Sequence, residues 1–260
     1  MSDDTKSNGK PPRGPKISKD SLRAPLAKRF YKSTSVAKRD GGYAVLLDGR
    51  AIKTPRKREL IAPTEPLASA VAAEWDAQKE HIDPGTMPLT RILNSAIDAV
   101  SERMGEVADD IVAFAGSDLL CYRAESPAGL VKRQSEAWDP VLAWAKKELG
   151  ADFRLRAGLM PIEQPAEALA AIRTALSGLD ALSLAALHVL TTIGGSALLA
   201  LAHLRGLLSA DEAWSSATVD EVWQSEQWGR DAEAEATAAL KRAEFEAASL
   251  CLCLRPRPPR

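Results

Sequence analysis

The strongest constraint on this fold is a stretch from residue 181 to residue 204 that contains no Asp, Glu, Lys or Arg. An apolar run of about 18 or more residues is long enough to cross a membrane. Here Gly194 and Gly195 interrupt the run, and each glycine weakens a continuous helix by roughly 1 kcal/mol relative to alanine. His188 and His203 add polar groups to the same stretch. The pattern therefore favours two buried helices, or one bent helix, over membrane insertion.

The first part of the chain carries strand and turn signals. Strands are predicted over residues 29–36, 43–47 and 50–54, with turn signals at 40–42 and 48–49. The pair Asp48-Gly49 between two short apolar runs is typical of a tight hairpin, because both turn positions need positive φ. The sequence thus predicts a small sheet, followed by an amphipathic helix over 65–79 that covers one of its faces.

Helical periodicity dominates the rest of the chain. Helices are predicted over residues 89–100, 104–114, 127–149 and 167–176, through the uncharged run, and over 219–254 with an interruption at Gly229. Ser209-x-x-Glu212 and Thr218-x-x-Glu221 both match the capping box that opens a helix. The predicted fold class is α+β: a small N-terminal mixed sheet–helix domain followed by a larger all-helical, orthogonal bundle-like C-terminal domain.

Charge is distributed unevenly along the chain. Residues 1–62 hold 16 Lys and Arg against 6 Asp and Glu, whereas the whole chain of 260 residues holds 34 against 35. Such a split suggests two surfaces with different roles. The predicted boundaries are a disordered basic leader over 1–23, the mixed domain over 24–86, the helical domain over 87–254 and a disordered basic tail over 255–260.

The sequence contains no motif of an established catalytic or nucleotide site, such as a phosphate loop, a dinucleotide fingerprint or a nucleophile elbow. Cys251 and Cys253 could supply two of the four ligands that structural zinc prefers. Three cysteines are too few for a disulfide framework in a chain this long, which favours a reducing compartment. We therefore predict no catalytic residue, no metal, no cofactor and no small-molecule substrate.

Two other function classes stay open at this point. The first is an enzyme with an unrecognised site, in which Cys121 or His188 would act. The second is a nucleic-acid binder that uses the basic end of the hairpin, where Lys53 and residues 56–58 gather positive charge. No recognition motif accompanies this charge, and the acidic remainder of the chain would repel phosphate. We therefore predict no nucleic-acid partner.

One helical segment, residues 219–231, does not fit simple core packing. Val219, Val222, Trp223 and Glu226 fall on one stripe of a helix, where the last position would be apolar if the stripe only packed. A carboxylate there is either paired with a cation of the same domain or exposed on a recognition surface, since burial of a lone charge is too costly. Trp228 follows close behind, and tryptophan is enriched at binding hot spots.

An ordered set of short motifs resembles a known family, the assembly chaperones that handle the alpha subunit of the F-type ATP synthase catalytic head. The matching segments read RFYK at 29–32, LDGR at 47–50 with KTP at 53–55, EW at 74–75, MPLT at 87–90, DLLCYRA at 118–124, Gln134 with WDP at 138–140, GS at 195–196 and WQSEQWGRD at 223–231. The set spans roughly residues 29–231. The order of all the segments along the chain carries the resemblance.

The resemblance implies a function as well as a fold. The chain would bind the unassembled alpha subunit and shield the surface that the beta subunit later covers, without hydrolysing nucleotide. By the resemblance, the partner-binding residues would come from the last matching segment and the residues just before it. They are Glu221, Gln224, Glu226, Trp228, Arg230 and Asp231. The start of the chain resembles neither a secretory signal nor a transit peptide. The expected location is the cytoplasm of a bacterium, or the mitochondrial matrix if the source is eukaryotic.

Overall fold

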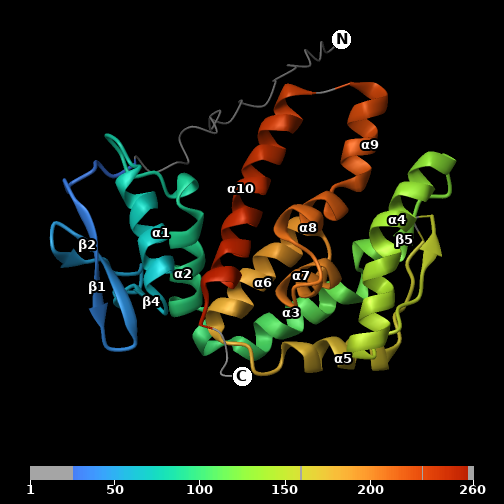
Figure 1. Ribbon diagram of the computed structural model, residues 1–260, viewed down its shortest axis with the longest axis horizontal. Coiled ribbons are helices and arrows are strands. Elements are labelled where there is room, and N and C mark those ends of the chain that lie inside the picture. The colour runs from blue at the N-terminus through green and yellow to red at the C-terminus, as the bar shows by residue number, and fades with distance from the viewer. Residues whose placement is uncertain (1–25, 159, 230, 257–260) are drawn as a thin grey trace, which may run out of the picture.

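The computed structural model describes residues 26–158, 160–229 and 231–256, and it has a small sheet beside a larger helical body (Figure 1). The predicted leader over 1–23 and most of the predicted tail lie outside the described residues. The fold is α+β, as the sequence predicted. Among the described residues, no helix is both long enough and apolar enough to cross a membrane.

The sheet is built on a central strand. Strand β2 (Gly42–Leu47) pairs antiparallel with β1 (Thr34–Arg39), β3 (Arg50–Ala51) and β4 (Ile61–Ala62). The predicted turn at Asp48-Gly49 is confirmed, because both residues have positive φ, 47° and 79°. The first predicted strand, 29–36, was placed too early, since β1 begins only at Thr34. Helix α1 (Glu65–Asp76) covers one face of the sheet, as expected.

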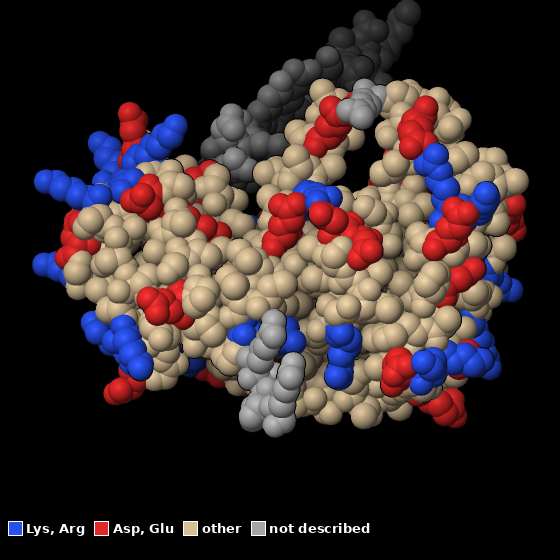
Figure 2. Space-filling view, in the orientation of Figure 1, with Lys and Arg blue, Asp and Glu red and all other residues tan. Residues whose placement is uncertain are grey.

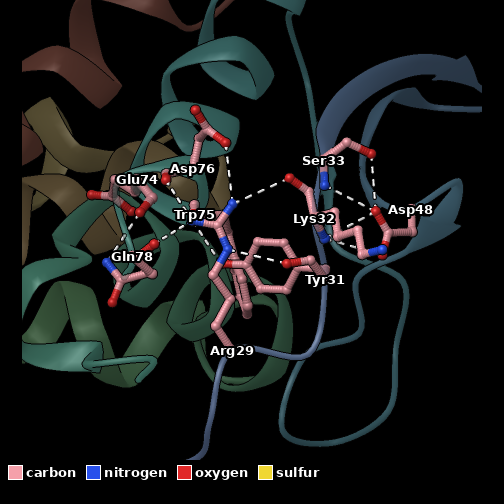
Figure 3. Close-up of polar contacts among 9 residues, drawn as sticks. All are labelled: Arg29, Tyr31, Lys32, Ser33, Asp48, Glu74, Trp75, Asp76 and Gln78. Carbon is pink, nitrogen blue, oxygen red and sulfur yellow. Dashed lines mark hydrogen bonds and ion pairs between the residues drawn. The ribbon is translucent and has the colours of Figure 1, made fainter. Parts of the chain in front are cut away.

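Side-chain contacts explain why residues 29–33 are not a strand (Figure 3). The hydroxyl of Tyr31 donates to the carbonyl oxygen of Trp75 at 2.6 Å, which ties this segment to the end of α1. The carboxylate of Asp48 accepts the amides of Lys32 and Ser33 at 3.1 and 2.9 Å, and these bonds lower its pKa. The amides of Lys32 and Ser33 therefore bond to a turn carboxylate instead of to a neighbouring strand.

Glu74 connects the EW segment at 74–75 to the MPLT segment at 87–90. Its carboxylate accepts the amides of Leu89 and Thr90 at 2.7 and 2.8 Å, at the start of helix α2 (Pro88–Asp98). The residue before that helix, Met87, gives no side-chain cap. Glu74, on α1, therefore caps the next helix in place of a local residue. Burial raises the pKa of Glu74, although the bonds from Thr90 and Leu89 favour its charged form.

This cap leads to a stability prediction. Glu74→Ala leaves the amides of Leu89 and Thr90 without an acceptor at a buried helix start, so we expect a loss of about 2–3 kcal/mol in the free energy of unfolding. Glu74→Gln keeps one acceptor oxygen and should cost about half as much. Urea denaturation followed by circular dichroism measures both variants. Equal, near-zero losses would show that water satisfies these amides.

The helical body surrounds the predicted uncharged run. The run forms two helices, α6 (Ala181–Gly194) and α7 (Ala197–Leu204), which are largely buried, so this prediction is confirmed. Gly195 between them has φ of 67°, the left-handed conformation that ends a helix. The surrounding helices are α3 (Met104–Gly116), α4 (Ala128–Trp144, continued by a π turn over Ala145–Leu149), α5 (Ala166–Leu176) and α8 (Ala210–Ala217), with a two-strand pair of β5 (Tyr122–Arg123) and β6 (Arg156–Ala157).

A buried carboxylate joins two parts of this body. Asp118 is completely buried, and it accepts the amides of Leu120 and Leu198 at 3.1 Å each. The hydroxyl of Ser196 and the amide of Ala197 also donate to it. Asp118 thus fixes the turn before β5 to the start of α7. Burial raises its pKa from 3.8 to about 6, against the opposing effect of these hydrogen bonds.

The end of the chain forms two helices, α9 (Val219–Trp228) and α10 (Ala232–Leu254), so the predicted interruption at Gly229 is confirmed. The capping box at Ser209 is present at the start of α8. The second one is not formed, because the hydroxyl of Thr218 donates backward to the carbonyl of Trp214 at 2.9 Å. The side chain of Glu221 therefore does not cap the start of α9.

Packing continues across the predicted domain boundary at residues 86 and 87. One cluster of buried apolar residues runs from the sheet through α1 and α2 into the helical body. The hydroxyl of Thr64 donates to the carbonyl of Leu254 at 2.5 Å, so the end of α10 reaches the start of α1. An ion pair of Arg91 with Glu244, at 2.7 Å, joins α2 to α10. The exact division into domains stays a prediction.

Candidate partner-binding surface

We call residues 219–240 the arm: helix α9 and the first part of α10. The arm projects from the helical body, with α9 rising away from α8 and α10 returning toward the sheet domain (Figure 1). Helix α9 has no buried residue, and the first buried residue of α10 is Phe245. Trp228 is 79% exposed and Val222 is 45% exposed. The arm therefore presents apolar side chains that nothing in the described chain covers.

One face of α9 is attached to α4. Glu226 pairs with Arg133 at 2.7 Å, and the Arg133 guanidinium stacks 4.8 Å from the centroid of the Trp223 ring. The side-chain amide of Gln134 donates to Asp220 at 2.8 Å. The bond from Arg133 lowers the pKa of Glu226, so this carboxylate stays ionised well below neutral pH. These contacts orient the arm relative to the body.

Close packing at Gly129 supports the same contact. A Cβ atom at this position would lie 2.5 Å from the ring of Trp223, which is closer than carbon atoms approach in proteins. Glycine at 129 thus allows α9 to lie against α4. The Gly129–Trp223 contact and the Arg133 stacking could not be deduced from the sequence, because they join residues almost a hundred positions apart.

The opposite face of α9 is free of such contacts. At 100° per residue, Glu221, Ser225 and Trp228 lie on the side of the helix away from Trp223. Glu221 is exposed and has no ion pair or hydrogen bond among the described residues. The sequence placed Trp223 and Glu226 on the candidate recognition stripe, but the structure turns them toward α4. The unpaired carboxylate of this helix is Glu221.

The other candidate residues flank these two faces. Gln224 is exposed on α9, and Asp231 accepts the amide of Glu233 at 3.1 Å as the cap of α10. Arg230 lies outside the described residues. The structure thus brings most of the predicted residues into one projecting segment, although it divides them between an attached face and a free face.

The residues proposed for the alternative enzyme do not form a site. Cys121 is buried, and burial raises the pKa of its thiol to about 12, which disfavours the nucleophilic thiolate. No hydrogen bond joins it to His188 in the described part of the chain. His203 bonds to Ser249 at 2.8 Å and to the carbonyl of Leu208 at 3.0 Å, inside the packing between α7 and α10. No cluster of three potential metal ligands occurs among the residues described.

Part of the basic run on the hairpin is neutralised within the protein. Arg56 and Arg58 both pair with Glu102, which lowers the pKa of that carboxyl group. Asp98 accepts the amide of Arg56 at 2.9 Å and the hydroxyl of Thr54 at 2.7 Å. These arginines therefore join the hairpin to the end of α2, which leaves less free charge for a phosphate backbone than the sequence suggested.

The described chain combines a small sheet with a larger helical body, from which the arm projects with an exposed Trp228. Residues 28–146 match the model of a family described as ATP12 chaperone protein. With the relatives below, this match shows that the chain belongs to the ATP12 chaperone family, as the resemblance indicated.

Individual relatives cover most of the chain. A protein of Agrobacterium tumefaciens, described as a candidate chaperone, is 46% identical, with a TM-score of 0.83 over 90% of this chain and 88% of its own. Atp12 from Paracoccus denitrificans is 44% identical, with a TM-score of 0.80 over 88% of this chain and 99% of its own. The mitochondrial protein atp12 of Schizosaccharomyces pombe is 27% identical over 220 residues, 80% of this chain and 76% of that protein.

Proposed function

We propose that this protein is an assembly chaperone of the F-type ATP synthase that binds the unassembled alpha subunit of the catalytic head. Membership of the ATP12 chaperone family supports a chaperone role. The observation that carries the proposal is the arm, where Trp228 is 79% exposed on a helix with no buried residue. Such a surface is costly to leave in water unless a partner covers it.

The proposed mechanism needs binding alone. An unassembled subunit exposes the surface that its neighbours will cover, and such surfaces aggregate. The chaperone covers the beta-facing surface of the alpha subunit, and the beta subunit displaces it because the true interface is larger and tighter. This exchange requires no nucleotide hydrolysis and no catalytic residue. It would take place where the alpha subunit accumulates, in the bacterial cytoplasm or, in a eukaryote, the mitochondrial matrix.

Within the arm, we assign different roles to the two acidic candidates. Glu221, which is exposed and unpaired, and Trp228 make direct contacts with the partner, flanked by Gln224 and Asp231. Glu226 holds α9 against α4 through Arg133. Arg230 stays a candidate contact by sequence.

The test of the function uses purified alpha subunit. We expect the protein to suppress aggregation of the isolated subunit, measured by light scattering, and to elute with it as a complex on gel filtration. Addition of beta subunit should release the chaperone. Absence of both protection and complex would refute the proposal, and protection by an equal concentration of an unrelated soluble protein would show that the effect is nonspecific.

A charge-swap experiment tests the role of Glu226. Glu226→Lys should keep the fold, because the Arg133–Glu226 pair is partly exposed and such pairs contribute little stability. It should nonetheless weaken alpha-subunit binding, since two like charges then push α9 from α4. Arg133→Glu combined with Glu226→Lys restores an attractive pair and should recover binding. If circular dichroism shows Glu226→Lys to be unfolded, this carboxylate is needed for folding instead.

Recovery in the double variant separates the two roles of Glu226. A residue that orients the arm is rescued by the swapped pair, whereas a residue that touches the partner directly is not. Binding that stays lost in the double variant, with a native spectrum, would move Glu226 to the contact surface.

A further inference from the structure

The inner side of the arm has two walls, only one of which is α9. Figure 2 shows an opening between α9 and the upper part of α10, with acidic side chains on both helices. We propose that these two inner faces form a clasp that holds an amphipathic helix of the client, with an apolar face and flanking Lys or Arg side chains. The inference rests on the proposed function for the identity of the client, but not for the chemistry of the bound helix.

Helical geometry identifies the inner wall of α10. Phe245 packs against Trp214 of α8, with ring centroids 5.4 Å apart, so its side of α10 faces α8, the helix that precedes α9. At 100° per residue, Ala238 and Ala234 lie within about 20° of Phe245 around the helix axis. Both alanines are exposed, because α10 has no neighbour at that height. The core-facing stripe of α10 therefore continues upward into the opening as a row of small apolar residues.

The alanine-rich composition of this wall allows it to stay helical without packing against another helix. Ala232, Ala234, Ala236, Ala238 and Ala239 fill much of the first part of α10. Alanine has the highest helix propensity and loses no side-chain entropy, so this part stays helical without burial. Small side chains also let a second helix approach closely, as in packed helix pairs with short interaxial distances. The wall is thus preformed for a helix and does not need the client to order it.

The charge of the arm defines the partner further. Residues 219–240 contain six carboxylates, at positions 220, 221, 226, 231, 233 and 235, and one arginine. Glu226 is already paired with Arg133, whereas Glu221 has no ion pair among the described residues and, at 100° per residue, lies on the side of α9 away from Trp223. An apolar surface bordered by carboxylates is complementary to an apolar stripe bordered by Lys or Arg. It would repel an acidic helix of equal hydrophobicity.

A pair of matched variants on α10 tests the clasp. Ala238→Arg places a bulky cation on the inner wall, and Leu240→Arg places the same side chain about 160° away, on the outer side of α10 that the clasp does not use, where Leu240 is 67% exposed. Arginine is a strong helix former, so both should fold. We expect Ala238→Arg to weaken alpha-subunit binding about 10-fold or more, and Leu240→Arg to change it less than about 2-fold. Equal effects of the two variants would overturn the clasp.

A second probe tests the chemistry without the alpha subunit. An 18-residue tryptophan-free peptide with Leu and Lys at helical spacing should bind the full chain, in a salt-sensitive manner, and shift the emission of Trp228 to shorter wavelength. The matching Leu and Glu peptide should bind about 10-fold more weakly. Trp228→Phe identifies the emission change, and Ala238→Arg should reduce the affinity for the basic peptide. Equal binding of the two peptides, or binding of neither, would refute the clasp.

The two experiments separate the two proposals. If the protein binds the basic peptide through the inner wall but not the alpha subunit, the proposed client is wrong and the clasp stands. If the Ala238→Arg and Leu240→Arg variants bind the alpha subunit with equal affinity, the proposed client is correct and the clasp is wrong.

Discussion

Trp228→Glu is expected to abolish protection of the alpha subunit while leaving the free energy of unfolding almost unchanged. Trp228 is 79% exposed, so the fold loses almost no buried area when it is replaced. In a bound complex the same ring would be desolvated, and loss of a tryptophan hot spot costs about 2 kcal/mol or more, which is about 30-fold in affinity. The added carboxylate increases this loss if the covered surface is apolar. Titration calorimetry with alpha subunit measures the affinity.

A conservative variant and a distant control complete this test. Trp228→Phe keeps an aromatic ring and should retain most of the affinity. Leu155→Glu changes another exposed apolar side chain, 48% exposed and far from the arm in sequence, and should have no effect on binding. If Trp228→Glu binds the alpha subunit as well as the wild type, the contact surface lies outside α9.

The second large effect concerns stability at Asp118. In Asp118→Ala, the buried amides of Leu120 and Leu198 and the hydroxyl of Ser196 lose their acceptor. Each unsatisfied buried donor costs about 1–3 kcal/mol, so we expect a loss of about 3 kcal/mol or more at neutral pH. Urea denaturation measures this loss. A smaller loss would indicate that water enters the space that the carboxylate leaves.

Asp118→Asn isolates the contribution of ionisation. The folded pKa of about 6 is above the ordinary 3.8, so the folded state binds the proton more tightly than the unfolded chain does. The resulting stability is fully present below pH 4 and is lost as pH rises through about 6. The free energy of unfolding of the wild type, relative to Asp118→Asn, should therefore increase by up to about 3 kcal/mol from pH 7 to pH 4. A difference that stays constant would show that Asp118 titrates normally.

The features that the sequence located most accurately depend on neighbouring residues. The uncharged run could be divided into two helices because the effect of glycine on a helix is local. The Asp48-Gly49 turn was predictable because the two turn residues themselves favour positive φ. The strand over 29–36 was misplaced because Asp48 and Trp75, distant in sequence, bind that segment. Local patterns do not specify such partners.

The candidate site shows the same limit. The sequence located the unusual segment and recognised that Glu226 must be either paired or exposed. Only the tertiary arrangement places Arg133 beside it and leaves Glu221 free. Likewise, the alanines of α10 carry no local signal of a surface, because alanine is common in any helix. Their position on the Phe245 side of α10 becomes visible only when α8 is in place.

The position of α10 has a consequence for biosynthesis. This helix is made after the sheet and the other helices described here, yet it packs against α6, α2 and the start of α1. Until α10 has been made, the emerging chain exposes the apolar surfaces that Phe245, Ala248 and Leu252 will later cover. Domains ordinarily fold as they are made, but the sheet and the helical body have to wait for α10. A chain whose translation stalls before α10 is complete would thus expose apolar surface as an unassembled client does.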